Sequence, residues 1–131
     1  MRNMPYQIDI RCEPGYLYVQ AWGTRSSGNL VSIVKDYFQA NEEHGCKKIL
    51  VDVRSMTGKL SAFDAYRFGT TAIEKAGEID SKVKTAIVDL EENRKRFDFL
   101  EDASVNNRGF NLRYFSKVAD AEQWLSKSKR L

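Results

Sequence analysis

The chain has 131 residues, a formal net charge of +3, and hydrophobic and charged fractions of 42% and 30%. This length and composition predict one globular domain over residues 1–131 that folds without a disulfide or a bound metal. Basic residues are interspersed with acidic ones except in the tail at 127–130. A nucleic-acid-binding protein concentrates its basic residues on one face, so we expect no nucleic-acid partner.

The two cysteines, Cys12 and Cys46, have no CxxC partner, and His44 is the single histidine. This pattern contains neither a metal-ligand cluster nor a disulfide framework, so we predict two reduced thiols, no metal site and no cofactor. The N-terminus lacks the apolar core of a signal peptide. No apolar run approaches the roughly 18 residues of a membrane span. We therefore expect a cytoplasmic protein without a membrane span.

The first elements are predicted to be an antiparallel hairpin and a helix. Residues 7–12 alternate polar and apolar side chains, Pro14-Gly15 is a turn signal, and residues 16–22 form a second strand. Ser27 or Asn29 is expected to cap the following helix, and Gly45 to end it. The apolar positions of this helix recur at helical spacing: Leu30, Ile33, Val34, Tyr37 and Phe38.

The middle of the chain predicts a buried strand followed by a loop and a second helix. Residues 48–53 form a nearly continuous apolar run, which is typical of a strand covered on both faces. A loop over 54–60 follows, and Ser61 with Asp64 resembles a capping box at a helix start. We expect this helix to bury one stripe of side chains: Phe63, Tyr66, Thr70, Ile73 and Ala76.

The last part of the chain continues the alternation of strand and helix. Residues 84–90 predict another central strand, and Glu91 begins a helix that continues to Val105. Residues 112–125 predict a strand, a turn and a helix that buries Val118, Ala121, Trp124 and Leu125. The order β-β-α-β-α-β-α-β-α predicts an α/β fold with a five-stranded mixed sheet, an antiparallel first strand and four helices.

Three stretches resemble the STAS domains, the fold of the anti-sigma-factor antagonists, and more closely the uncharacterised SpoIIAA-like bacterial branch of that fold. They are the strand at 49–53, the turn Asn107-Arg108-Gly109, and the strand-helix unit that ends at Trp124-Leu125. The resemblance implies a single domain without enzymatic activity that regulates or binds another protein. CRAL-TRIO lipid-binding domains have a similar fold, so a binder of a small apolar ligand is the alternative.

The resemblance also implies a candidate phosphorylation site. In STAS regulators, a partner kinase phosphorylates a serine at the start of the helix after the second parallel strand, and this controls binding to a switch protein. Ser61 stands at that position, where the family pattern is Asp-Ser-x-Gly and this chain has Leu60-Ser61-Ala62-Phe63. The simpler role of Ser61 is to cap the helix.

The loop after the strand at 48–53 carries the other candidate partner-binding side chains: Asp52, Arg54, Ser55, Thr57 and Lys59. Open α/β sheets bind ligands at the carboxyl ends of their strands. Arg54 and Lys59 could hold an anion, although the loop lacks the glycine-rich cradle of a phosphate site. Asp52 is expected to pair with Arg54 or to accept loop N–H groups, whereas a general base would need a raised pKa.

Three aromatic side chains, Tyr16, Tyr18 and Trp22, lie on one face of the second strand. If this face is open, it is a candidate interface for a partner protein or a homodimer, and if a helix covers it, the rings belong to the core. We predict a non-enzymatic regulatory or protein-interaction module that acts through the strand-end loops and the helix start near Ser61.

Overall fold

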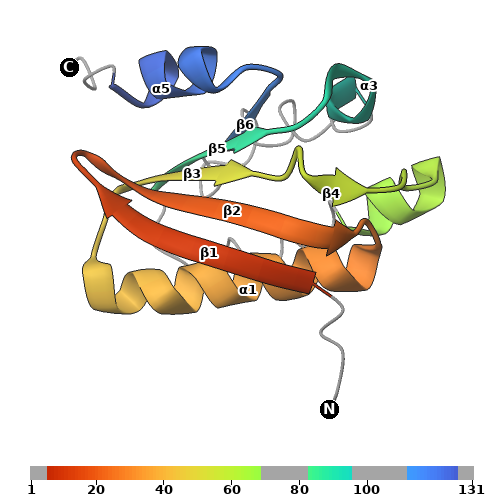
Figure 1. The fold of residues 1–131 in the computed structure, drawn as a ribbon, viewed down its shortest axis with the longest axis horizontal. Helices are drawn as coiled ribbons and strands as arrows, with labels where there is room; N and C mark the ends of the chain where they lie inside the picture. The colour runs from red at the N-terminus through yellow and green to blue at the C-terminus, as the bar shows by residue number, and fades with distance from the viewer. Residues whose placement is uncertain (1–5, 69–82, 96–111, 127–131) are drawn as a thin grey trace.

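The computed structural model describes residues 6–68, 83–95 and 112–126, and it begins with an antiparallel hairpin. Strand β1 (Tyr6–Glu13) pairs with β2 (Tyr16–Thr24) from Tyr6 opposite Gly23 to Glu13 opposite Tyr16. Gly15 has a φ of 94° in the connecting turn, a conformation that glycine adopts without steric cost. The predicted hairpin is therefore confirmed (Figure 1).

Three further strands extend the sheet in parallel with β2. Strands β3 (Lys48–Asp52), β5 (Lys84–Val88) and β6 (Leu112–Phe115) give the order β1-β2-β3-β5-β6. A short strand, β4 (Met56–Thr57), pairs with the end of β2 from within the loop predicted at 54–60. The five predicted strands are confirmed, and the first of them is antiparallel, as predicted. Strand β4 was not predicted, because a segment of two residues shows no strand pattern in the sequence.

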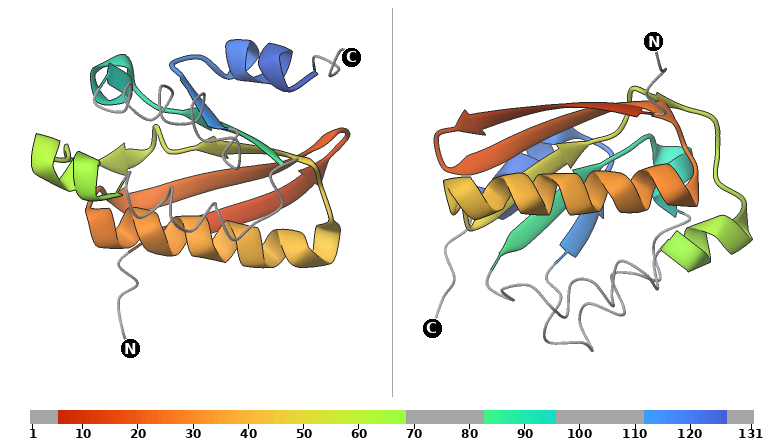
Figure 2. Two further views of the ribbon diagram at one scale, coloured as in Figure 1. Left: turned by 180° about the vertical axis from the view of Figure 1, so that it is seen from behind. Right: turned by 90° about the horizontal axis from the view of Figure 1, so that it is seen from below.

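Helices lie on both faces of this sheet, so the domain has three layers (Figures 1 and 2). Helix α1 (Ser27–His44) covers one face, and α3 (Glu91–Arg94) and α5 (Val118–Ser126) lie on the other. Helix α1 is capped by Ser26, whose Oγ accepts the N–H of Asn29 at 3.1 Å, rather than by Ser27 or Asn29. Gly45 ends the helix in the left-handed conformation, as predicted.

Each face of the sheet has its own hydrophobic core. The larger core lies beneath α1, and the smaller one joins Leu50, Ala86 and Val88 to Ala121 and Leu125 of α5. Strand β3 contributes to both cores, which explains its nearly continuous apolar sequence. Of the four residues expected to be buried in the last helix, Ala121 and Leu125 are buried, and the other two pack against the smaller core at its margin.

The helix that follows Ser61 buries a different face from the one predicted. It is helical over 62–68, where Phe63 and Tyr66 are 67% and 59% exposed, whereas Ala65 and Phe68 are buried. Ala65 and Phe68 are also three residues apart and form a second apolar stripe, and it is this stripe that packs against the larger core. The described residues do not include the other predicted positions of this stripe, Thr70, Ile73 and Ala76. They also do not include the turn at 107–109 or the part of the predicted helix beyond residue 95.

Within residues 6–68, 83–95 and 112–126, no helix combines the length and the apolar composition required to cross a membrane.

Candidate functional site

The carboxyl ends of the parallel strands β2, β3 and β5 meet at one edge of the sheet. We call this edge the strand-end rim; it comprises Arg25, Asp89, Leu90 and residues 52–63. The chain leaves β3 at the rim, forms β4 beside the end of β2, and then enters the helix at residue 62. Every residue of the predicted phosphorylation or partner-binding group therefore lies on one rim.

Asp52, the last residue of β3, is buried and bound by Arg54. The Nε and Nη2 atoms of Arg54 donate to its two carboxylate oxygens at 2.9 and 2.8 Å, and the Arg54 N–H donates at 3.0 Å. The hydroxyl of Tyr18 donates a fourth hydrogen bond at 3.2 Å. The predicted pairing of Asp52 with Arg54 and with a loop N–H is confirmed.

The surroundings of Asp52 make it a stable carboxylate. Burial alone would raise its pKa, but the hydrogen bonds and the charge of Arg54 outweigh burial and leave the pKa below the ordinary value of 3.8. A general base working near neutral pH needs the opposite shift. Asp52 therefore anchors the start of the loop, and the raised pKa that an enzymatic role would require is not found.

The remaining predicted residues of the loop are exposed: Ser55, Thr57, Lys59 and Ser61. The Thr57 hydroxyl donates to the carbonyl of Gly23 at 3.4 Å, so this group and the Arg54 guanidinium already have protein partners. The Ser61 Oγ accepts the N–H of Asp64 at 3.0 Å, which confirms its role as a helix cap.

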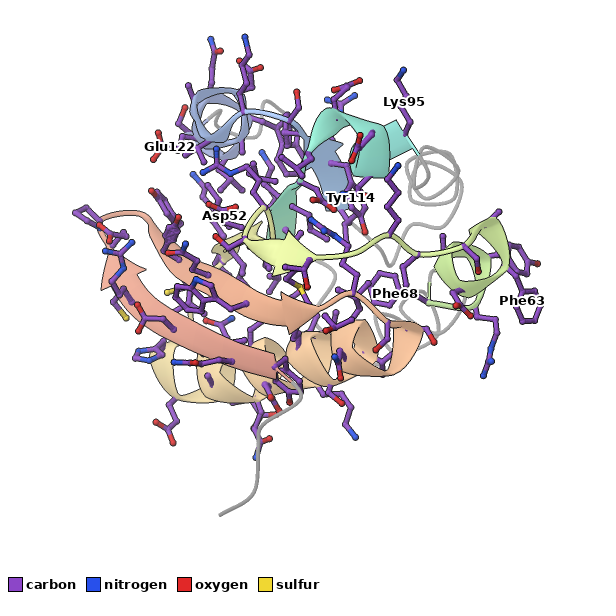
Figure 3. All side chains as sticks on the ribbon, turned by 45° about the vertical axis from the view of Figure 1, so that its right-hand side comes forward. Asp52, Phe63, Phe68, Lys95, Tyr114 and Glu122 are labelled. Carbon is purple, nitrogen blue, oxygen red and sulfur yellow. The ribbon has the colours of Figure 1, made fainter. Side chains whose placement is uncertain are left out.

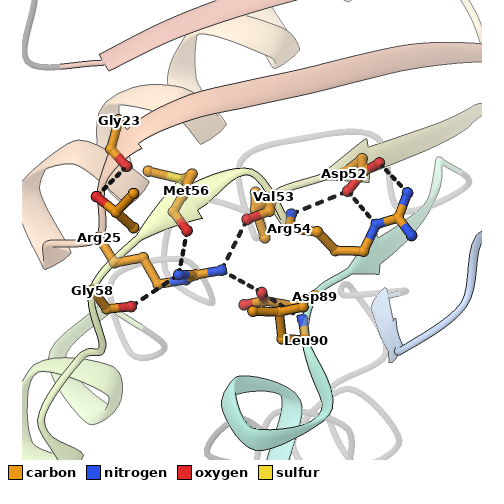
Figure 4. A network of polar contacts seen from close by, with 10 residues as sticks. Gly23, Arg25, Asp52, Val53, Arg54, Met56, Gly58, Asp89 and Leu90 are labelled. Carbon is orange, nitrogen blue, oxygen red and sulfur yellow. Dashed lines mark hydrogen bonds and ion pairs between the residues drawn. The ribbon is translucent and has the colours of Figure 1, made fainter.

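A buried arginine that the sequence analysis missed organises the rim. Arg25, just after β2, is 7% exposed. Its Nη1 donates to the carbonyls of Met56 and Gly58 at 2.5 and 2.9 Å, and its Nη2 donates to the carbonyl of Val53 at 3.0 Å (Figure 4). Three carbonyls of the loop over 53–58 thus converge on one guanidinium, and this charge-assisted network fixes the path of the loop.

The same guanidinium forms an ion pair with Asp89, which follows β5. Arg25 Nη2 lies 2.6 Å from Asp89 Oδ1, which also accepts the N–H of Leu90 at 2.7 Å. Burial raises the pKa of Asp89, and the charge and hydrogen bonds of Arg25 oppose this without cancelling it. One sequence signal could have indicated this residue: Val88-Asp89 repeats the Val51-Asp52 pair at the end of the neighbouring strand.

A small cavity lies between Arg25, Asp89 and the core beneath α1. Its volume is about 30 Å³, and its walls include Ile33, Tyr37 and Phe68. A second, open hollow of about 220 Å³ lies against the start of α1. Ligand pockets usually measure about 300–1,000 Å³. Neither of these two hollows, both lined by described residues, is large enough for the apolar ligand of the CRAL-TRIO alternative.

The large apolar side chains that are exposed in the described part of the chain are Phe63, Tyr66 and Leu90, the last of them 43% exposed. All three lie on the rim or in the first two turns of the helix that begins there. The Phe63 ring points away from the body of the protein, whereas Phe68 points inward (Figure 3). The Arg67 guanidinium lies 5.8 Å from the centre of the Phe63 ring. Aromatic side chains and arginine on one exposed face are typical of protein interfaces.

The aromatic face of β2 is half-buried. Tyr16 and Tyr18 pack against the smaller core beside α5, and the Tyr16 hydroxyl donates to Glu122 of that helix at 2.7 Å. Burial, followed by the Glu122 carboxylate, raises the pKa of Tyr16 to about 12. Trp22 is also half-buried. The two tyrosines thus have contacts within the domain, and an interface role for this face stays a prediction.

Solved structures of other proteins have the same architecture as this chain. No family model matches the sequence, and a search of curated proteins found no match. A crystal structure of an anti-sigma factor antagonist from Mycobacterium paratuberculosis superposes with a TM-score of 0.62 over 93% of this chain and 95% of that chain, at 12% sequence identity. The chain has the fold of this anti-sigma factor antagonist.

A second solved structure has the same fold. An uncharacterised protein of the DUF3478 family from Shewanella loihica, described as SpoIIAA-like, superposes with a TM-score of 0.52. The match covers 95% of this chain and 98% of that chain, at 19% identity. At these low sequence identities, the similarity shows the SpoIIAA-like fold and does not show the function of the rim.

Proposed function

We propose that this SpoIIAA-like chain is a non-enzymatic regulatory module that binds a protein partner through the strand-end rim and the helix over 62–68. The observation that carries the proposal is the exposure of Phe63 and Tyr66, at 67% and 59%, on the helix that follows the rim. The solved structure of an anti-sigma factor antagonist with the same fold supports this class of role.

The chemistry of the surface favours a protein as the partner. Phe63 and Tyr66 are three residues apart and therefore lie on one side of the helix, and Arg67 lies against Phe63. Large rigid aromatic rings bury much area for little loss of side-chain entropy, and tyrosine and arginine dominate the binding energy of many interfaces. Lys59 adds an exposed cation on the rim, whereas the charge of Arg54 is paired with Asp52, so we expect the partner to place an acidic group opposite Lys59.

The buried network beneath the surface supports the same role. Arg25 binds the carbonyls of Val53, Met56 and Gly58, and so holds the loop in one conformation before a partner arrives. A surface that is already ordered loses less conformational entropy on binding. We infer that Arg25 positions the rim and that the exposed side chains make the contacts.

Ser61 is the candidate for control of this interaction by phosphorylation. Its hydroxyl is exposed and lies two residues before Phe63, at the start of the helix. A phosphate there would place negative charge beside the aromatic surface and near helix N–H groups. Mapping of phosphorylated residues in protein purified from the source cell tests this point, and the absence of phosphate on Ser55, Thr57 and Ser61 under all growth conditions contradicts it.

The binding proposal is tested by comparing proteins captured from the source cell by three forms of the chain. The forms are the unmodified protein, the double variant F63D/Y66D, and Gln39→Asp, which adds an acid at an exposed position in the second half of α1. We expect a specific partner to be captured by the unmodified protein and by Gln39→Asp but lost from F63D/Y66D. Equal capture by all three forms, with the fold of each verified by circular dichroism, contradicts the proposal.

A further inference from the structure

The two cysteines and the single histidine of the chain all lie toward one end of the sheet, opposite the strand-end rim. Cys12 is in β1, opposite Leu17 of β2, and Leu17 is opposite Ile49 of β3. Cys46 lies three residues before Ile49, in the connection between α1 and β3. The contact between Cys12 and His44 brings Cys12 close to the segment that holds Cys46, two residues after His44 and 34 positions from Cys12 in the sequence.

Cys12 lies on the α1 side of β1 and contacts the histidine. Tyr6, Ile8 and Ile10 alternate along β1 toward the core beneath α1, and Cys12 continues that alternation. Its Sγ lies 3.0 Å from Nδ1 of His44, the last residue of α1. Both side chains are exposed, so a small reagent in solution can reach the sulfur. A thiol hydrogen-bonded to an imidazole is the arrangement that enzymes use to activate a cysteine nucleophile.

Cys46 is held in place beside this pair. The buried Asn41 side chain accepts the Cys46 N–H at 3.0 Å and donates to the Cys46 carbonyl at 2.9 Å, so the backbone of Cys46 is fixed on both sides. Burial raises the pKa of the Cys46 thiol, and the charge and hydrogen bond of the Cys12 sulfur raise it further. Cys46 follows His44 by two residues, so its partly shielded thiol lies near the exposed pair of Cys12 and His44.

We propose that Cys12 and Cys46 form a reversible redox pair that responds to hydroperoxides, with Cys12 as the reacting thiol, His44 as its activating base and Cys46 as the resolving thiol.

The chemistry balances with a hydroperoxide as the oxidant. His44 takes the proton of Cys12, and the thiolate attacks the terminal peroxide oxygen, so the O–O bond breaks. Cys12 becomes a sulfenic acid, and the leaving oxygen takes a proton to form water or an alcohol. The Cys46 sulfur then attacks the Cys12 sulfur, the S–O bond breaks, and the hydroxyl leaves as water with the proton of the Cys46 thiol as the disulfide forms. Two molecules of a low-molecular-weight thiol restore both cysteines by thiol–disulfide exchange and are themselves joined as a disulfide.

The expected consequence is a new covalent link between an edge strand and the interior of the sheet. Strand β1 is paired on one side by β2 and lies at the end of the strand order. A disulfide to Cys46 would join it to the segment that leads into β3. We therefore expect oxidation to slow hydrogen exchange of the β1 amides and to leave the rim unchanged.

The test is treatment of the folded, full-length chain with hydrogen peroxide, followed by mass spectrometry and peptide mapping. We expect loss of the mass of two hydrogen atoms, a Cys12–Cys46 cross-linked peptide, and recovery of the original mass with dithiothreitol. In Cys46→Ser, a sulfenic acid on Cys12 should be trapped by dimedone. In His44→Asn the reaction should be slower by a factor of about ten or more, whereas the neighbouring exposed variant Glu43→Gln should react like the unmodified chain.

Three results would overturn the proposal. The first is the absence of an intramolecular disulfide at any peroxide concentration that leaves the fold intact. The second is an equal reaction rate in His44→Asn and Glu43→Gln. The third is an equal rate for the folded chain and for the chain unfolded in urea, because proximity in the fold would then contribute nothing.

Discussion

Arg25 and Asp89 form a buried ion pair that joins the end of β2 to the end of β5, two strands separated in the sheet by β3. Arg25 Nη2 lies 2.6 Å from Asp89 Oδ1, and the two side chains are 5% and 3% exposed. The same guanidinium binds three carbonyls of the loop between β3 and the next helix. One buried side chain thus fixes the relative positions of three segments of the rim (Figure 4).

Replacement of Arg25 by methionine should destabilise the domain strongly. The change leaves Asp89 buried without its partner and leaves the loop carbonyls without a donor, and removal of one member of a buried pair costs about 3–5 kcal/mol. Urea unfolding followed by circular dichroism measures the free energy of unfolding. The double variant R25M/D89N should lose less than the sum of the two single variants, because the uncompensated charge is then absent. Additive losses would contradict a direct coupling of the two residues.

Asp52 should make the stability of the domain depend on acid pH. Its pKa in the folded state is lowered from 3.8, so it contributes stability above that value, and this contribution is lost as the pH falls through the folded-state pKa. The Arg54 side chain is 42% exposed, so solvent screening limits the contribution to about 1 kcal/mol. In Asp52→Asn this part of the pH dependence should disappear when urea unfolding is compared at a series of pH values. An unchanged slope in the variant would contradict the role of the pair.

Phe63 and Phe68 should differ sharply in their effect on stability. Phe63→Ala should change the free energy of unfolding by no more than about 0.5 kcal/mol, because the ring is exposed. Phe68→Ala removes a ring that is 4% exposed and should cost about 3–5 kcal/mol. The two variants remove the same side chain from one helix, so each is the control for the other. Similar losses in both would contradict the observed orientation of this helix.

Ser61 should stabilise the start of the helix independently of any modification. Its Oγ accepts the N–H of Asp64, and loss of such a cap costs about 1 kcal/mol, so Ser61→Ala should lose that amount. Ser61→Asp retains an acceptor and should lose less. Thermal unfolding of the two variants checks the order, and a more stable alanine variant would show that the cap does not contribute.

The order of the elements could be predicted because it depends on local patterns. The alternation in β1, the apolar run of β3 and the helical spacing in α1 each follow from contacts with the nearest layer. The prediction for the buried face of the helix after Ser61 is wrong because two apolar stripes compete in this helix. The larger rings, Phe63 and Tyr66, favoured the stripe that the structure leaves exposed.

The connections that organise the site could not be predicted because they join residues far apart in the sequence. Arg25 and Asp89 are 64 positions apart, and Arg25 stands between polar residues that give no sign of burial. Cys12 and His44 are 32 positions apart and meet only after β1 has paired with β2. By contrast, the pairing of Asp52 with Arg54 spans two residues and was accessible from the sequence.

The most direct test of the central claim is the dissociation constant of the captured partner, measured by calorimetry for three forms of the chain. We predict that F63D/Y66D binds at least about tenfold more weakly than the unmodified protein, because loss of an aromatic anchor typically costs more than about 1.4 kcal/mol. Trp22→Ser, on the half-buried face of β2, should bind like the unmodified protein. Unchanged binding by F63D/Y66D together with loss of binding in Trp22→Ser would contradict the account and place the interface on β2.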